Sequence, residues 1–349
     1  MRINTYISPL CPASALLVAV HLLLPSATAS ILNLGAEQIV QAGGVNLSVP
    51  GHSVPAFVDW NNDGLGDLIV GQGNGTYPPG KLRVYVNTGT PADPQFSSYF
   101  FAQSNGADLT VPASGCLGLF GRTTYWDADG RKDLVVGKAD GTVLLYTNVG
   151  TDAAPTFDGG INLQVGQPGS KVNINVGARA TPIMVDWNND GRKDLVIGGL
   201  DGKIHVFINE GTDTAPDFLT QILVQSGGTD LVVPTQRSSP VVLDLTDDGK
   251  KDLLTGNTEG QLLLYPNNGT DANPSFSYYS YVTADGVPIH LPGTPRSRPF
   301  VCDWNSDGLS DVLIGAGDGL VHLYLGVPEP TTLGLLGLAA LVLRFRRAA

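Results

Sequence analysis

Residues 59–71 read DWNNDGLGDLIVG, and residues 186–198 read DWNNDGRKDLVIG. The same acidic motif returns as YWDADGRKDLVVG at 125–137, DLTDDGKKDLLTG at 244–256 and DWNSDGLSDVLIG at 303–315. Its five copies begin 58 to 66 residues apart. Near-constant spacing of this kind indicates a repeat architecture. The sequence therefore predicts one array of five units.

Two other short sequence segments repeat with the same period as the acidic motif. One follows each of the first four copies, as in VNTGTPADPQF at 86–96 and TNVGTDAAPTF at 147–157. A shorter one precedes the motif, as in VNLSVP at 45–50. The segments between turns are short and rich in β-branched and aromatic residues, without a helical period. For the first unit we predict strands at 56–59, 67–71, 82–86 and 95–102.

Four strands in a unit of about 60 residues are typical of a propeller blade. We therefore predict an all-β fold, a five-bladed β-propeller of four-stranded blades. The fifth unit ends at 321–326, VHLYLG, and lacks the repeated segment that follows each of the first four copies of the motif. Residues 31–40, ILNLGAEQIV, form an unmatched strand at the other end. We predict that this N-terminal strand completes the fifth blade and closes the ring.

The spacing within the motif points to a metal site. Carboxylate or amide oxygens recur at positions 1, 3, 5 and 9, and a backbone carbonyl at position 7 can join them around a hard cation such as calcium. Glycine at position 6 permits the sharp turn that such a loop needs. We number the loops 1 to 5 in chain order and predict up to five calcium ions.

The predicted ligands are the side chains at positions 1, 3, 5 and 9 and the carbonyl at position 7. They are Asp59, Asn61, Asp63, Leu65 and Asp67 in loop 1; Asp127, Asp129, Arg131 and Asp133 in loop 2; Asp186, Asn188, Asp190, Arg192 and Asp194 in loop 3; Asp244, Thr246, Asp248, Lys250 and Asp252 in loop 4; and Asp303, Asn305, Asp307, Leu309 and Asp311 in loop 5. Tyr125 replaces the first aspartate of loop 2, which we therefore expect to be the weakest or an empty site.

The alternative interpretation is that Asn-Asp-Gly and Asp-Asp-Gly simply form good hairpin turns. That explains one Asp-Gly in each loop. It does not explain three carboxylates in each loop, since like charges a few ångströms apart repel one another without a cation.

The charge excludes some partners. Residues 30–330 hold all 32 acidic residues but 16 of the 20 basic ones, a net charge of −16. Such a chain repels nucleic acid and anionic membrane surfaces and attracts cations. His205 and His322 share a strand position with Arg83, Leu144 and Leu263, which is too variable for a metal ligand. No catalytic motif of the Ser-His-Asp or His-Glu-x-x-His type is present.

The tryptophans occupy a regular place. Trp60, Trp126, Trp187 and Trp304 stand at position 2 of their motifs, and Leu245 takes that position in loop 4. A sugar-stacking platform is one interpretation. A position shared with leucine favours packing between blades.

Both ends of the chain carry export signals. Residues 1–29 combine Arg2, an apolar run and a small-residue cleavage site, which is the form of a signal peptide. Its removal leaves Cys116 and Cys302, and we expect Cys302 to be a buried free thiol. Residues 327–349 join Pro-Glu-Pro, an apolar stretch too short for an ordinary membrane span and an arginine cluster. This tail resembles the PEP-CTERM signal that exosortases read; the alternative is a marginal membrane anchor.

The recurring motif resembles the FG-GAP or VCBS-type repeats of integrin α-subunit propellers and of many secreted bacterial proteins. The resemblance covers about residues 31–326, and it departs at Tyr125, at Thr246 and in the lengthened stretch VPASGCLGLFGRTTYW at 111–126. In that family the acidic loop holds structural calcium. The resemblance implies an exported propeller, residues 30–326, that touches the membrane only through its tail.

Three functions follow from these features. The first is a non-catalytic calcium-binding propeller at the cell surface or in the extracellular matrix, with an extracellular protein or polysaccharide as its ligand. The second is a carbohydrate-binding lectin, which the sequence hardly distinguishes from the first. The third is an enzyme, which we disfavour because the lengthened stretch before Trp126 adds no acidic residue or histidine.

Overall fold

The computed structural model describes residues 32–73, 80–112, 119–293 and 296–328, and every helix or strand element in them is a β-strand. The predicted signal peptide, Cys116 and all but the first two residues of the predicted sorting tail lie outside the described residues. Within these ranges, no helical segment has the length and apolar character needed to cross a membrane.

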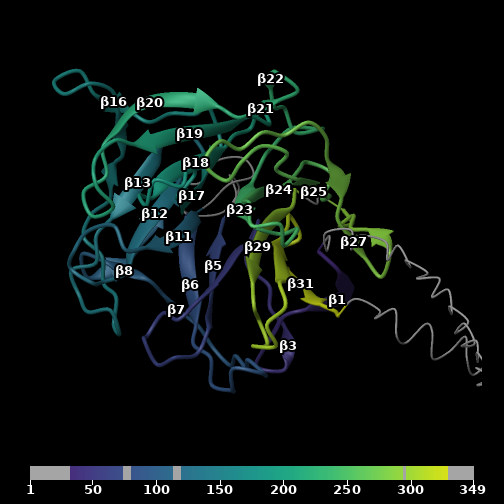
Figure 1. Ribbon diagram of the computed structural model, residues 1–349. Helices are drawn as coiled ribbons and strands as arrows, with labels where there is room; N and C mark the ends of the chain where they lie inside the picture. Colours follow the sequence, from purple (N-terminus) through teal and green to yellow (C-terminus); the bar gives the residue numbers. More distant parts are fainter. Residues whose placement is uncertain (1–31, 74–79, 113–118, 294–295, 329–349) are drawn as a thin grey trace, which may run out of the picture.

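Five sheets surround a common centre, one for each copy of the motif, and the four blade strands of each sheet pair antiparallel (Figure 1). In each sheet the strand before the acidic loop pairs with the strand after it, and two more strands follow outward. The blades are β4 (Val54–Val58), β5 (Asp67–Gln72), β6 (Gly80–Tyr85) and β7 (Phe100–Phe101); β11 (Phe120–Thr124), β12 (Asp133–Gly137), β13 (Val143–Tyr146) and β14 (Ile161–Asn162); β17 (Thr181–Val185), β18 (Asp194–Gly198), β19 (Ile204–Asn209) and β20 (Phe218–Leu223); β23 (Pro240–Leu243), β24 (Asp252–Gly256), β25 (Leu262–Tyr265) and β26 (Ser280–Tyr281); and β29 (Arg298–Cys302), β30 (Asp311–Gly315), β31 (Val321–Gly326) and β1 (Leu34–Ile39).

The first strands of the blades close the ring. β4 contacts β11, β11 contacts β17, β17 contacts β23, β23 contacts β29, and β29 returns to β4. β1 pairs antiparallel with β31, with Glu37 opposite Tyr324. In Figure 1 the purple β1 lies beside the yellow β31. The predicted closure by the N-terminal strand is confirmed, and it covers an edge that would otherwise be open.

Short hairpins follow the outer strand of each blade. They are β2 (Gln41–Ala42) with β3 (Val45–Asn46), β8 (Gln103–Ser104) with β9 (Ala107–Asp108), β15 (Gln164–Val165) with β16 (Val172–Asn173), β21 (Gln225–Ser226) with β22 (Thr229–Asp230), and β27 (Thr283–Ala284) with β28 (Val287–Pro288). One further strand, β10 (Thr110–Val111), pairs with β6.

The fourth strand of the first blade is shorter than predicted. β7 covers Phe100–Phe101, whereas the sequence predicts a strand over 95–102. The residues before β7 use their backbone groups elsewhere, since the Gln95 carbonyl accepts from Thr88 N at 2.9 Å and the Phe96 carbonyl accepts from Gly43 N at 2.9 Å. The segment therefore binds a turn and a neighbouring hairpin before it reaches β6.

Aromatic residues pack between neighbouring blades. Trp60 of blade 1 lies 5.9 Å from Phe157 of blade 2, between ring centroids, and both are buried. The equivalent pairs are Trp126–Phe218 at 6.2 Å, Trp187–Phe276 at 6.3 Å and Trp304–Phe96 at 5.8 Å. At the remaining interface Leu245 shares a buried cluster with Leu32 and Leu34 of the N-terminal segment. The predicted role of motif position 2 in packing between blades is confirmed. Cys302 is a free thiol, half-buried rather than buried as expected.

The glycine that ends each motif marks the closest approach of two blades. A Cβ added to Gly198 would lie 2.5 Å from the carbonyl oxygen of Ser238 in the next blade. The same contact would occur at 2.0 Å for Gly71, 2.1 Å for Gly137, 2.1 Å for Gly256 and 2.3 Å for Gly315. Ser238 also bridges the blades, because its Oγ accepts from Gly199 N at 2.9 Å and donates to the Lys203 carbonyl at 2.6 Å.

Candidate functional site

The aspartate at position 9 of each loop is fully buried at the start of the second strand. Asp194 accepts from Trp187 N through Oδ2 at 2.9 Å and from Asn209 N through Oδ1 at 2.7 Å. Its equivalents Asp67, Asp133, Asp252 and Asp311 are also fully buried and accept the same two backbone N–H groups. This carboxylate joins the acidic loop to the end of the third strand. It therefore has a structural role whether or not a cation is bound.

The side chains at positions 1, 3 and 5 surround the backbone of their own loop. In loop 3 the Asp186 carboxylate accepts from Asp190 N at 3.0 Å and from Gly191 N at 2.8 Å. Asn188 donates to Asp190 Oδ2 at 2.9 Å. Loops 1 and 5 repeat these contacts with Asp59, Asn61, Asp63, Asp303, Asn305 and Asp307. The structure thus brings positions 1, 3 and 5 together in three loops.

Loops 2 and 4 depart from this arrangement. In loop 4 Asp244 accepts from Asp248 N and Gly249 N, but Thr246 at position 3 is buried. In loop 2 the Tyr125 hydroxyl contacts Asp152 instead, at 3.3 Å. Position 4 has a left-handed backbone in loops 1, 3, 4 and 5, with φ from 55° to 59°, whereas loop 2 has none there. Position 6 glycine is left-handed in all five loops, as the sequence predicts.

A basic residue at position 7 neutralises part of the charge in loops 2, 3 and 4. Arg192 contacts Asp190 Oδ2 through Nη2 at 2.6 Å and donates from Nε to the Asn209 carbonyl at 2.8 Å. Lys250 Nζ lies 2.9 Å from Asp248, and Arg131 pairs with Asp129. Loops 1 and 5 have leucine at this position, Leu65 and Leu309. In the part of the chain that the structure describes, no ion pair involves the acidic residues of loops 1 and 5.

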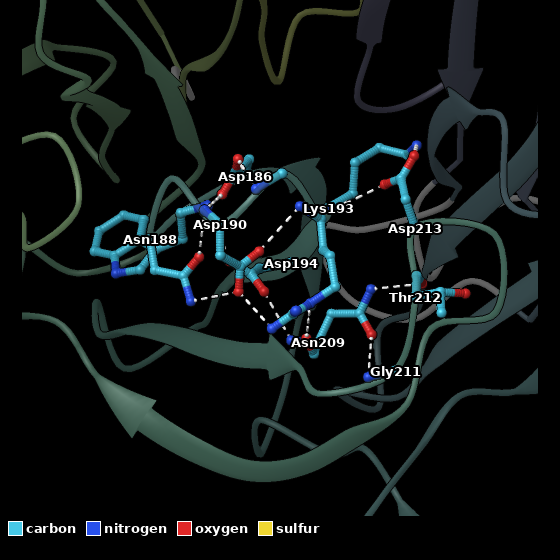
Figure 2. A network of polar contacts seen from close by, with 12 residues as sticks. Asp186, Asn188, Asp190, Lys193, Asp194, Asn209, Gly211, Thr212 and Asp213 are labelled. Atoms are coloured by element: carbon cyan, nitrogen blue, oxygen red, sulfur yellow. Dashed lines mark hydrogen bonds and ion pairs between the residues drawn. The ribbon is translucent and has the colours of Figure 1, made fainter.

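A second ion pair joins the acidic motif to the repeated segment that follows it. Figure 2 shows Lys193, whose backbone N donates to Asp213 Oδ1 at 2.9 Å and whose Nζ lies 2.5 Å from Asp213 Oδ2. Lys132 with Asp152 and Lys251 with Asp271 repeat it in loops 2 and 4. In the first unit both partners are missing together, since the sequence has Gly66 and Pro91. That joint absence is the signal from which the pair could have been predicted.

The asparagine of the repeated segment that follows the acidic motif is another functional residue that sequence reasoning did not identify. Asn209 Oδ1 accepts from Gly211 N at 2.9 Å and its Nδ2 donates to the Thr212 carbonyl at 2.9 Å. Figure 2 places these contacts beside Asp194, to which Asn209 N donates. Its recurrence as Asn87, Asn148 and Asn267 was the available signal. The acidic loop and this turn therefore form one polar network.

The histidines at the shared strand position have ordinary partners. His322 Nδ1 lies 2.5 Å from Glu37 Oε1 and its Nε2 lies 3.2 Å from Asp318 Oδ2. His205 Nδ1 contacts Gln221 Nε2 at 2.7 Å. Both ring nitrogens of His322 and one ring nitrogen of His205 therefore contact other side chains of the fold.

The loops offer donors of the kind calcium prefers, although they are not assembled as a metal site. Within the described ranges, no three His, Cys, Asp or Glu side chains are grouped in a way that could hold a metal ion. The oxygens of Asp and Asn nonetheless suit a hard cation. Burial, together with the negative charges of Asp190 and Asp186, raises the pKa of Asp194 to about 6, although the N–H groups of Asn209 and Trp187 act to lower it. Added positive charge would relieve this repulsion, so the donor chemistry fits calcium.

Two grooves lined by tyrosine form a separate candidate site. The groove of blade 1 measures about 420 Å³ and is lined by Tyr85, Tyr99, Ser97 and the hairpin residues around Asn46. The groove of blade 4 measures about 450 Å³ and is lined by the equivalent Tyr265, Tyr279 and Ser277, with Tyr278 and residues of β21–β22. The paired rings are 5.4 Å apart in blade 1 and 5.3 Å apart in blade 4. Tyr99, Tyr278 and Tyr279 are exposed.

Comparisons with known families agree with this geometry. The FG-GAP-like repeat matches residues 186–255, which include loops 3 and 4. The PEP-CTERM protein-sorting motif matches residues 326–348. The chain is a five-bladed propeller that matches the FG-GAP-like repeat over residues 186–255 and the PEP-CTERM motif at residues 326–348. The sorting motif marks an exported, membrane-associated bacterial protein, and it implies processing by an exosortase-type enzyme at the C-terminus.

Solved structures resemble the FG-GAP-like propeller only distantly. The chain is 13% identical to a putative oxidoreductase (glucose dehydrogenase) of Thermus thermophilus, covering 84% of this chain and all of that one, with a TM-score of 0.43. It is 15% identical to the Tc holotoxin pore of Photorhabdus luminescens, covering 83% of this chain and 12% of the toxin chain, with a TM-score of 0.40. The Dos1 propeller is 12% identical, with 78% and 54% covered and a TM-score of 0.30. No curated protein matched the chain.

Proposed function

We propose that the chain is a calcium-stabilised, non-catalytic propeller displayed at the bacterial cell surface or in the extracellular matrix, where it serves adhesion or matrix interaction. The sorting motif supports the location. The acidic loops support the calcium, and loops 1 and 5 carry that part of the proposal because leucine, not a basic residue, stands at their position 7.

The proposed calcium would be held by the side chains at positions 1, 3 and 5 and the carbonyl at position 7. The carboxylate at position 9 would lie next to these ligands. It would neutralise the carboxylates and fix the turn between the first two strands of a blade. Calcium sites in extracellular modules have dissociation constants of about 10⁻⁴ to 10⁻³ M. We rank loops 1 and 5 first, loop 3 next, loop 4 below it because of Thr246, and loop 2 last because Tyr125 replaces its first ligand.

The adhesion role is tested on whole cells. Cells that produce the full chain should retain it at the surface, and chelation should release it from a matrix preparation or lower its binding there. The control is a chain with Glu329→Ala in the sorting motif, which should lose surface retention without losing calcium binding. A chain that stays inside the cell, or that binds matrix equally before and after calcium removal, would contradict the proposal.

A second candidate function is carbohydrate binding, which the two tyrosine grooves favour. Their volumes lie in the range of small-molecule sites, and each combines aromatic faces with hydroxyl groups. Sugars are bound in this way, by stacking on an aromatic ring and by hydrogen bonds at the rim. Two equivalent grooves on one molecule would also allow a polysaccharide to bind at both.

The carbohydrate proposal is tested with a glycan array and the variants Tyr99→Ala and Tyr279→Ala. Each single change should weaken binding, and both together should abolish it. Tyr125→Ala, which removes an exposed tyrosine elsewhere, is the matched control. Absence of any glycan binding by the unaltered protein at millimolar concentration would exclude this function. The ligand in the adhesion proposal would then be a protein.

A further inference from the structure

The innermost strands of four blades line a partly open cavity of about 200 Å³. Its walls come from β11, β17, β23 and β29, which lie close to the middle of the ring in Figure 1. Apolar side chains predominate, among them Ile183, Val241 and Phe300. Arg122 and Thr123 supply the polar part of the lining.

Arg122 departs from the repeat at this place. Counting from the motif, the equivalent residues of the other blades are Ala56, Ile183, Val241 and Phe300, all of them apolar. Arg122 is only 6% exposed. A long cationic side chain has therefore been placed where every other unit supplies an apolar one.

The guanidinium of Arg122 has few contacts. Its Nη1 donates to the Gly121 carbonyl at 3.0 Å, and its carbon lies 4.5 Å from the ring centre of Phe120 and 5.3 Å from that of Phe300. Among the described residues Nη2 has no hydrogen-bond partner, and Arg122 forms no ion pair. Burial lowers the pKa of Arg122 to about 9, so the group is still a cation at neutral pH.

A buried charge without a counter-charge is costly. Cation–π contacts return about 0.5–2 kcal/mol, which offsets only part of that cost. Arg122 lines the cavity, which can hold a further acceptor. An anion placed there would supply both the hydrogen-bond acceptor and the opposite charge.

Other basic residues gather at one end of the same strands. His52, Arg179, Arg237 and Arg296 each lie four residues before the position equivalent to Arg122 in their blades. Arg179, Arg237 and Arg296 have left-handed backbones, with φ of 57°, 65° and 47°, a conformation that costs energy in residues other than glycine. Burial and the four arginines at 298, 296, 179 and 237 lower the pKa of His52 to about 3, so it remains neutral beside Arg296, 3.0 Å away.

We propose that this axial cavity binds a small organic carboxylate, with its oxygens on the Arg122 guanidinium and its apolar body against Ile183, Val241 and Phe300. A bidentate carboxylate suits the planar fork of arginine. A sugar fits poorly, because one arginine and one threonine hydroxyl cannot satisfy its many hydroxyl groups. Inorganic phosphate would leave the apolar walls unused. The gathered arginines would attract such an anion in a chain that is otherwise acidic.

The test is calorimetric titration of the purified full chain with four probes: sodium benzoate, sodium acetate, sodium phosphate and benzyl alcohol. Benzoate should bind most tightly, acetate at least tenfold more weakly, and neutral benzyl alcohol should show no binding. Arg122→Met should weaken benzoate binding at least tenfold. Lys203→Met, which removes a basic residue that pairs with Asp230 on a hairpin, should leave it unchanged.

A second variant keeps the charge and fills the space. Ile183→Phe should exclude benzoate while Arg122 remains in place, and this result does not depend on whether Arg122→Met folds. Phosphate binding as tight as benzoate binding would overturn the assignment to a carboxylate with an apolar body. Failure of benzoate and acetate to bind the unaltered chain would overturn the site altogether, as would a benzoate affinity that Ile183→Phe leaves unchanged.

Discussion

Arg192 contacts Asp190 through Nη2 and Oδ2 at 2.6 Å, within the loop whose oxygens we propose as calcium ligands. The guanidinium would therefore compete with the proposed cation for one carboxylate. The same would hold for Lys250 with Asp248 and for Arg131 with Asp129, but not for Leu65 or Leu309. One repeated motif thus yields loops of two kinds.

Removal of the competing charge should strengthen calcium binding. Exposed ion pairs of this kind contribute about 0.2–1 kcal/mol, so Arg192→Leu should tighten the affinity of loop 3 by roughly 1.4-fold to fivefold. The measurement is a calcium titration by calorimetry. Lys203→Leu, which breaks the ion pair with Asp230 on a hairpin, is the control and should change nothing. An unchanged affinity in Arg192→Leu would show that the pair does not compete with calcium.

Loss of a ligand should matter more in loop 5 than in loop 2. At a free calcium concentration 100 times the dissociation constant, an occupied site contributes about 2.7 kcal/mol to the free energy of unfolding. Asp307→Ala should lose most of this contribution, whereas Asp129→Ala should lose little. Thermal unfolding with calcium and with a chelator checks both variants.

Chelation also separates the loss of bound calcium from any other destabilising effect of the substitution. In chelator the difference between Asp307→Ala and the unaltered protein should shrink, because neither then holds calcium in loop 5. A melting temperature that chelator does not move would contradict the calcium proposal. Equal losses in both variants would contradict our ranking of the loops.

The close approach of blades at the end of each motif predicts a steric effect. Gly198→Ala would place a Cβ 2.5 Å from the Ser238 carbonyl and should lower the free energy of unfolding by about 1–3 kcal/mol. Gly159→Ala is the control, since its Cβ would meet only the end of the Asn105 side chain, at 3.2 Å. Denaturant unfolding measures both. Equal stability of the two variants would show that the blades can move apart at no cost.

The closure of the ring should depend on pH. Burial lowers the pKa of His322, but Asp318 and Glu37 outweigh it and raise the pKa above its ordinary value of 6.5. Because the folded pKa is the higher one, the ion pair contributes fully below about pH 6.5 and is lost as pH rises through the folded pKa. Amide hydrogen exchange in β1, corrected for the intrinsic rate, should therefore be slower at pH 6 than at pH 9.

Glu37→Gln provides the control for that experiment. It removes the partner on β1 and keeps the side chain's size, so the pH dependence of exchange in β1 should become smaller. If the unaltered protein shows equal protection at both pH values, the His322–Glu37 contact does not stabilise the closure.

Much of the fold could be predicted because its determinants are local. The period of the motif and the unmatched strands at the two ends were sufficient for five blades and their closure. Trp60 and its equivalents recur at one position, which pointed to packing between blades. The fourth strand of blade 1 was predicted too long, because the carbonyls of Gln95 and Phe96 accept from Thr88 N and Gly43 N, contacts that strand propensity does not describe.

The candidate site was predicted less completely. The acidic positions were evident, but the buried role of Asp194 depends on Asn209 N, and the pair between Lys193 and Asp213 spans 20 residues. The spacing of the motif identifies candidate ligand oxygens, but it does not show which of these oxygens already accept hydrogen bonds in the fold. The division of the loops into two kinds likewise follows from contacts rather than from the motif.

The sequence by itself determined the repeat, the number of blades, the loops that suit a cation and the signals for export, because each depends on neighbouring residues or on a period. Only the tertiary structure decided what Arg122 faces. It lies in a lengthened stretch whose lack of acidic residues and histidine gave no reason to single it out. Closing the ring brings strands about 60 residues apart to one axis, and only there does the arginine become a buried charge in an apolar cavity.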